Sequence, residues 1–166
     1  MKLLVMADSH KNKDAVREVV FNNLDKVDRF IHLGDGVEEL LEVMDELECM
    51  DYLFVSGNHE EDKYYNITPD YQLLTIGGHK LLITHGDKYY NKLDLLGVAH
   101  IANSNGADIA LCGHTHIACD EEVKGVRIIN PGALEYWRDD LPKYAIIDIN
   151  DEIEVVFFEG RTKHES

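Results

Sequence analysis

Short clusters of aspartate, histidine and asparagine recur along this chain, and they are its strongest chemical signal. Carboxylate oxygens, imidazole nitrogens and amide oxygens are all ligands for divalent metal ions. The five clusters are Asp8-Ser9-His10, Gly34-Asp35-Gly36, Gly57-Asn58-His59-Glu60, Thr84-His85-Gly86-Asp87 and Gly113-His114-Thr115-His116. Two histidines one residue apart, as at positions 114 and 116, are the most specific of these signals.

Each cluster on its own has a plainer interpretation. A triplet such as Asp8-Ser9-His10 also occurs in turns and helix caps, and Gly34-Asp35-Gly36 is typical of a tight turn. His59 alone fits a polar surface loop. However, all five clusters directly follow an apolar run, at the place where open α/β sheets carry their ligand-binding loops. This shared position favours one metal centre over five unrelated turns.

The elements that position these clusters follow from hydrophobic periodicity. Strands are expected at 2–7, 27–33, 52–55, 71–76, 80–84, 109–112, 122–123, 126–129, 144–149 and 153–158. Helices are expected over 15–24, with Asn12 or Asp14 near its start as N-cap, and over 37–47 and 93–103. A helix-rich half followed by a strand-rich half predicts an α/β fold with two sheets face to face and helices outside.

Composition predicts one soluble domain over 1–166, with 162–166 as a flexible tail, in the cytoplasm. The chain has 166 residues, 45% of them hydrophobic, and lacks the apolar run that a membrane span needs. Three cysteines without C-x-x-C spacing indicate neither a disulfide framework nor a thiolate zinc site.

Charge and motif content exclude several partners. The net charge is -16, and the basic residues are scattered, so nucleic acid is not expected as a partner. The dinucleotide fingerprint is broken by Glu39, and no P-loop is present. Among the other histidines, His32 lies within an apolar run and is expected to be a core residue.

In this order, the five clusters resemble the motifs of the calcineurin-like metallophosphoesterase superfamily. Asn130-Pro131-Gly132-Ala133 further resembles the N-P-G-S turn of its short single-domain members, and the length resembles the YfcE-type phosphodiesterase group. The resemblance implies a four-layer α/β/β/α sandwich of two mixed sheets. It also implies hydrolysis of a small phosphoester, most readily a phosphodiester, with two divalent transition-metal ions. Manganese is the first expectation, with iron, nickel, cobalt or zinc as alternatives.

The resemblance also implies roles for individual residues. One ion would be held by Asp8, His10, Asp35 and His116, and the other by Asp35, Asn58, His85 and His114. A hydroxide bridging both ions would attack phosphorus, and His59 would protonate or neutralise the leaving oxygen. Two dications, two carboxylates and this hydroxide leave a formal charge of about +1, which attracts a phosphate without any lysine cluster.

Departures from the superfamily patterns narrow the function. The arginines beside the second and third motifs of protein serine/threonine phosphatases are absent, which disfavours phosphoprotein substrates. His59 stands where many YfcE-type sequences have cysteine, and Ala133 replaces a serine. Small-molecule phosphomonoesterase activity remains an alternative. A non-catalytic scaffold is another, because the same fold includes a retromer subunit, although that subunit lacks key histidines that this chain retains. A repair-type nuclease is disfavoured by the acidic charge. The natural substrate and the oligomeric state, including a homo-oligomer, stay open.

Overall fold

The computed structural model describes residues 1–89, 94–135 and 141–160. Its helices are α1 (Lys13–Asn23), α2 (Val37–Glu46) and α3 (Leu96–Ser104), with a short 3-10 helix, η1, at Asp62–Tyr64. Its strands are β1 (Lys2–Met6), β2 (Arg29–His32), β3 (Tyr52–Phe54), β4 (Tyr71–Ile76), β5 (His79–Thr84), β6 (Ile109–Cys112), β7 (Cys119–Val123), β8 (Val126–Asn130), β9 (Lys143–Ile149) and β10 (Ile153–Glu159).

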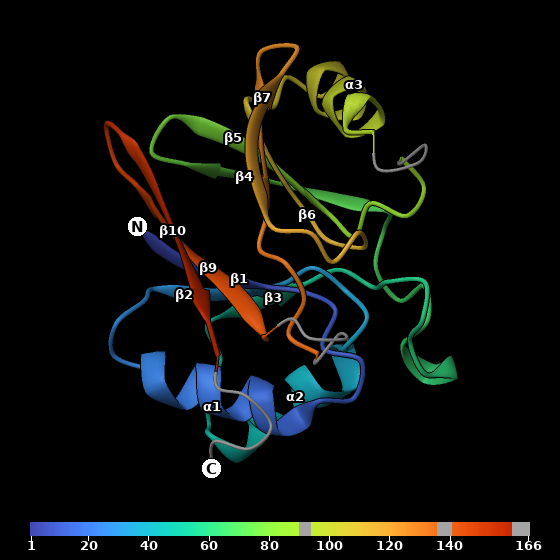
Figure 1. The fold of residues 1–166 in the computed structure, drawn as a ribbon, viewed down its shortest axis with the longest axis vertical. Coiled ribbons are helices and arrows are strands. Elements are labelled where there is room, and N and C mark those ends of the chain that lie inside the picture. Colours follow the sequence, from blue (N-terminus) through green and yellow to red (C-terminus); the bar gives the residue numbers. More distant parts are fainter. Residues whose placement is uncertain (90–93, 136–140, 161–166) are drawn as a thin grey trace.

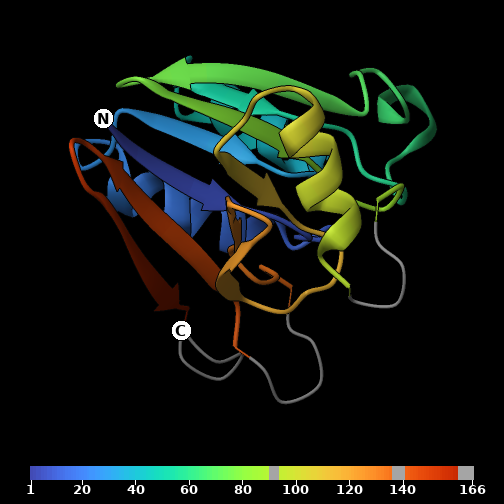
Figure 2. The ribbon, with the colours of Figure 1, turned by 90° about the horizontal axis from the view of Figure 1, so that it is seen from above.

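These strands form two mixed sheets that face each other (Figures 1 and 2). The first has the order β10-β9-β1-β2-β3, in which β1, β2 and β3 are parallel. The second has the order β4-β5-β6-β8-β7, in which β5, β6 and β8 are parallel. Antiparallel strands complete both sheets. Each sheet therefore contains three adjacent strands whose carboxyl ends lie at one edge.

Three separate hydrophobic clusters show that the molecule has four layers. Leu3, Val5 and Ile31 of the first sheet pack with Leu81 and Ile109 of the second. A second cluster lies between the first sheet and helices α1 and α2, and a third joins α3 to the second sheet. Burial of apolar side chains on both faces of each sheet is the main stabilising contribution. The predicted α/β/β/α sandwich is confirmed.

Most predicted elements agree with the structure to within a few residues. Asn12 is the N-cap of α1, and its side chain accepts a hydrogen bond from the backbone N–H of Ala15. Strands β9 and β10, near the end of the chain, return to the first sheet, where β9 pairs with β1. The two halves of the sequence therefore do not correspond to the two sheets. Residue 93 of the third predicted helix and the tail at 162–166 lie outside the described residues.

No helix within the described part of the chain is long and apolar enough to cross a membrane.

The turn between β7 and β8 allows a test of backbone strain. Lys124 and Gly125 both have positive φ, 53° and 81°, as a primed two-residue hairpin turn requires. We expect Lys124→Asn to raise the free energy of unfolding by about 0.5 kcal/mol, because asparagine tolerates this conformation. Lys124→Val should lower it. Urea denaturation measures both, and a midpoint shift of the same sign in the two variants would contradict this account.

Candidate metal centre

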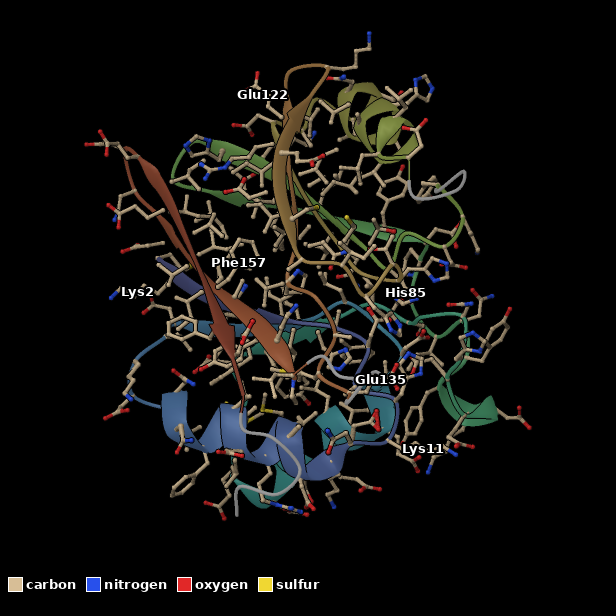
Figure 3. All side chains as sticks on the ribbon, in the orientation of Figure 1. Lys2, Lys11, His85, Glu122, Glu135 and Phe157 are labelled. Carbon is tan, nitrogen blue, oxygen red and sulfur yellow. The ribbon has the colours of Figure 1, made fainter. Side chains whose placement is uncertain are left out.

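Five predicted motifs and the turn after β8 meet at the edge where the parallel strands of both sheets end. Backbone hydrogen bonds join their loops, from Asp8 N to Gly34 O at 2.9 Å and from Gly113 N to His85 O at 3.0 Å. His85 is labelled in Figure 3 at the junction of the two sheets. The loops are thus part of the sandwich and not flexible additions to it.

One group of candidate ligands consists of Asp8, His10 and His116, whose ligand atoms lie within 4.8 Å of one another. The Nε2 atoms of the two histidines are 3.2 Å apart. Oδ1 of Asp8 lies 3.5 Å from Nε2 of His116 and 3.7 Å from Nε2 of His10. Three donor atoms from the loops after β1 and β6 therefore surround one point.

A second group consists of Asp35, His85 and His114, also within 4.8 Å of one another. Oδ1 of Asn58 lies 2.9 Å from Nε2 of His85, which adds the predicted amide oxygen. Oδ2 of Asp35 lies 3.2 Å from Nε2 of His85 and 3.6 Å from Nε2 of His10. The carboxylate of Asp35 thus faces imidazoles of both groups, as a bridging ligand must.

The carboxylate of Asp8 gives an independent reason to expect a cation. Asp8 is fully buried, and Oδ1 is the buried side-chain atom within the described ranges that has no hydrogen-bond partner. Its other oxygen, Oδ2, accepts the backbone N–H of His114 at 2.9 Å. A buried, ionised oxygen without a donor is strongly unfavourable, and a metal ion would satisfy it. The donor set of carboxylates, imidazoles and an amide fits a divalent transition metal.

The imidazole of His85 is held in one orientation. Its Nδ1 donates to the carbonyl oxygen of Leu33 at 2.7 Å, so Nε2 points into the site. Burial opposes protonation of this ring, but the hydrogen bond to Asp35 and the charges of Asp8 and Asp35 outweigh it and raise the pKa of His85 to about 9. In metal-free protein, a proton on His85 thus places positive charge beside both carboxylates.

The carboxylates respond in the opposite direction. Burial alone would raise the pKa of Asp8, but the neighbouring imidazoles of His10 and His116 hold it well below its usual range. The pKa of Asp35 is also lowered, mainly by His85 acting against burial. Both acids are therefore ionised at neutral pH, and the site attracts cations.

Glu60 fixes the loop that carries Asp35, a role that the sequence did not reveal. Its two carboxylate oxygens accept four backbone N–H groups at 2.8 to 3.1 Å, and these belong to Asp35, Gly36, Val37 and Gly57. Three of these donors lie at the start of α2, where a negative charge is favourable. Glu60 thus holds the second and third motifs together.

A buried polar network lies beneath the loop that carries Asp8 and His10. Gly34 N donates to Nδ1 of His32, so Nε2 of this ring carries the proton and donates to Oγ of Ser9 at 3.0 Å. Ser9 in turn donates to Oε1 of Glu39 at 3.0 Å. Burial lowers the pKa of His32 to about 4, which keeps the ring neutral. The expectation of a hydrogen-bonded core histidine is confirmed.

Two further residues, Asn130 at the end of β8 and Glu135 after it, support the site; the sequence marked Asn130 as part of the N-P-G turn, and Glu135 was missed. Asn130 Nδ2 donates to the carbonyl of Gly113 at 3.1 Å and to Oγ1 of Thr115 at 3.0 Å, so the N-P-G turn supports the histidine loop. Oε1 of Glu135 lies 3.2 Å from Nδ1 of His116. Burial raises the pKa of Glu135. Its position in the sequence could have indicated Glu135. The five motifs follow the parallel strands β1, β2, β3, β5 and β6, and residue 135 lies shortly after the sixth parallel strand, β8.

His59 lies at the open side of the centre. Its backbone N–H donates to Oδ1 of Asp35 at 2.8 Å, and its ring centroid is 6.0 Å from that of His10. The ring is exposed and lines a cavity of about 360 Å³ together with His10 and Asp35. The cavity is completed by Lys11, Gly36, Glu38, Glu39, Glu60 and Glu61.

Backbone strain is concentrated in the predicted ligands. Five of the seven have positive φ, namely Asp8, His10, Asp35, His114 and His116, with values between 41° and 73°. Aspartate and histidine tolerate this region better than most residues, yet it remains unfavourable for any residue with a Cβ atom. The loops therefore adopt a conformation that the local sequence alone does not favour.

Comparison with known proteins gives a consistent result. The chain matches the family model described as the calcineurin-like phosphoesterase superfamily domain over residues 1–152. It is 33% identical over 166 residues to YsnB of Bacillus subtilis, named a probable metallophosphoesterase, with 99% of this chain and 94% of the relative covered. It is 29% identical over 164 residues to a phosphodiesterase of Methanocaldococcus jannaschii, with 89% and 93% covered.

Solved structures show the same fold. A predicted phosphoesterase from Streptococcus pneumoniae superimposes with a TM-score of 0.77 at 26% identity, covering 95% of this chain and 88% of that one. A single mutant of Vps29 from Entamoeba histolytica gives a TM-score of 0.74 at 24% identity, with 96% and 100% covered. The second likeness concerns the fold alone.

The pH dependence of stability at alkaline pH should disappear when metal is added. The pKa of His85 is raised above its unfolded value of about 6.5, so its contribution is complete below that pH and is lost as pH rises through about 9. Metal-free protein should therefore lose stability from pH 6.5 to 9. With manganese, the ion replaces the proton, so His85 is unprotonated in the folded state as well as in the unfolded chain above pH 6.5, and this loss of stability should disappear. Urea denaturation with EDTA or manganese measures both slopes; equal slopes would contradict this assignment.

Replacement of Glu60 tests the backbone clamp. Glu60→Gln should lower the free energy of unfolding by about 2–4 kcal/mol, because an amide NH2 cannot accept the N–H groups that one carboxylate oxygen now binds. Glu61→Gln is the matched control, since Glu61 makes an exposed ion pair with Lys11, and its unfolding midpoint should hardly change. Similar losses in both variants would argue against the clamp.

Proposed function

This chain belongs to the calcineurin-like phosphoesterase superfamily, and we propose that it is a phosphodiesterase that hydrolyses small phosphodiesters at a centre of two divalent transition-metal ions. The observation that carries the proposal is the position of Asp35, whose Oδ2 faces His10 of one ligand group and His85 of the other. Manganese is the first candidate, and iron, nickel, cobalt and zinc have the same ligand preferences.

The ligand assignment follows the two groups. Asp35 is shared, which keeps two positive ions close by placing negative charge between them. The first ion would be held by Asp8, His10, Asp35 and His116, and the second by Asp35, Asn58, His85 and His114.

When bound, the two ions supply an acidified water and positive charge for the phosphoryl oxygens. The chain's own residues then set the geometry. The carbonyl of Leu33 orients His85, the backbone N–H of His114 orients Asp8, and the backbone N–H of His59 orients Asp35. The ligands are therefore arranged before substrate arrives, which is the main requirement for electrostatic catalysis.

His59 is proposed as the acid that protonates the leaving oxygen. It lies at the cavity wall beside His10 and Asp35, where the ester group of a bound diester would extend. Proton donation is needed when the leaving group is a poor one, such as an alkoxide. Asp35 contributes to the same step by fixing the backbone of residue 59.

The charge of the cavity supports a diester over a monoester. Four of its lining residues are glutamates, and its cation, Lys11, pairs with Glu61 at 2.8 Å. A diester carries one negative charge near neutral pH, whereas a monoester carries up to two. A surface of this charge also disfavours long polyanions such as nucleic acid. The name of the Methanocaldococcus relative, a phosphodiesterase, agrees with this preference.

The decisive assay uses purified protein with bis(p-nitrophenyl) phosphate and p-nitrophenyl phosphate. We expect turnover of the diester only after addition of manganese or another transition metal, and slower turnover of the monoester. Asp35→Asn should abolish it, because the shared ligand loses its charge, and any remaining activity reveals a contaminating phosphatase. Absence of turnover with every metal would favour the non-catalytic scaffold, and faster monoester turnover would favour the phosphomonoesterase.

A second test separates the proposed role of His59 from substrate binding. His59→Ala should slow diesters with alkyl leaving groups by about 10²-fold or more. It should slow nitrophenyl esters much less, since nitrophenolate leaves without a proton. The measurement is kcat for both classes in wild type and variant. Equal slowing of the two classes would assign His59 to binding instead.

A further inference from the structure

Glu135 lies beside the candidate metal centre, although none of the five motifs contains it. Oε1 of Glu135 is 3.2 Å from Nδ1 of His116 and 3.8 Å from Nε2 of His10. Its side chain is 19% exposed. Figure 3 shows it on the same side of the molecule as His85 and Lys11. Its position therefore invites the question of what the carboxylate does there.

The backbone of this residue is fixed to the strand that carries the first motif. Leu134 N donates to the carbonyl of Ala7 at 3.0 Å, and Glu135 N donates to that of Asp8 at 3.2 Å. The side chain of Asn12 donates to the carbonyl of Leu134 at 3.1 Å. These three hydrogen bonds fix the backbone from which the carboxylate reaches the His116 ring.

The chemistry of imidazole gives this contact a function. A neutral histidine binds metal through one nitrogen while the other carries a proton, and a partner for that proton fixes the tautomer and the ring orientation. Nε2 of His116 faces His10 and Asp8, and Nδ1 faces Glu135. His85 shows the same arrangement, with Leu33 as the acceptor.

We propose that Glu135 is a positioning residue that accepts the Nδ1–H of His116 and directs its Nε2 at a divalent metal ion shared with Asp8 and His10. This inference rests on the metal centre proposed above. Glu135 also adds a third negative charge beside Asp8 and Asp35. In the metal-free protein these charges repel one another, so the carboxylate strengthens metal binding without stabilising the metal-free fold.

Metal binding by calorimetry tests the proposal without reference to activity. Glu135→Ala should weaken one of two manganese sites by about 10- to 100-fold, while the other site changes little. Glu135→Gln keeps a carbonyl oxygen as acceptor and should lose less. Glu154→Gln, on the exposed face of β10, is the matched control and should bind as wild type does. The thermal midpoint of metal-free Glu135→Ala should be no lower than that of the control.

The outcomes separate the two proposals. Wild type that binds no manganese would overturn the metal centre itself. Wild type that binds two ions, with Glu135→Ala binding both within twofold of the same affinity, would overturn only the role of Glu135. A large fall in the metal-free midpoint of Glu135→Ala would assign the residue to folding instead.

A double-mutant cycle distinguishes positioning from direct ligation. If Glu135 acts through His116, adding Glu135→Ala to His116→Ala should leave manganese affinity unchanged within about twofold. A further fall as large as in the wild-type background would show that the carboxylate binds the ion itself and would overturn the positioning role. Nitrogen NMR of the His116 ring in the zinc-loaded protein, where the ion is diamagnetic, should also show protonated Nδ1, and a protonated Nε2 would contradict the proposal.

Discussion

The carboxylates of Asp8 and Asp35 are buried close together, and the surrounding structure has to compensate their negative charges. They are 0% and 2% exposed, and each charge raises the energy of the other. Backbone N–H groups of His114 and His59 bind one oxygen of each, and the imidazoles surround the remaining oxygens. This compensation is incomplete, because Oδ1 of Asp8 has no donor within the described chain. A divalent ion would complete it, so the stability of these loops and their affinity for metal depend on the same electrostatic balance.

Close packing keeps the carboxylates in place and explains two glycines. A Cβ atom at position 57 would lie 2.1 Å from Oδ1 of Asp35, and one at position 36 would lie 1.8 Å from Oγ of Ser9. Only glycine fits at either place. The same close packing accompanies the positive φ angles of the predicted ligand residues. Strained backbone of this kind persists only where other interactions hold it in place. Here the hydrogen bonds of Glu60 and the packed sheets and helices do so. The site is thus preorganised at the expense of local stability.

The sequence predicted the layers and the motifs because both depend on local patterns. An apolar run followed by a polar triplet marks a strand end wherever that strand lies in the sheet, so Asp8, Asp35 and His85 could be proposed without topology. The roles of Glu60 and Glu135 could not be predicted, since most of their partners are backbone and imidazole groups distant in sequence. The return of β9 to β1 was missed for a similar reason, because alternation predicts which face a side chain occupies but not which strand is adjacent.

The proposed ligands come from loops after different strands of both sheets, between positions 8 and 116, and Asn130 at the end of β8 and Glu135 after it support these loops. No contiguous segment contains one complete ligand group, so the centre forms only once the two sheets have packed against each other. A metal ion held by the complete group would therefore form its contacts late in folding. By the usual relation between transition-state structure and rates, interactions formed this late slow unfolding and leave the folding rate unchanged. Metal binding at the proposed centre would thus extend the lifetime of the folded molecule.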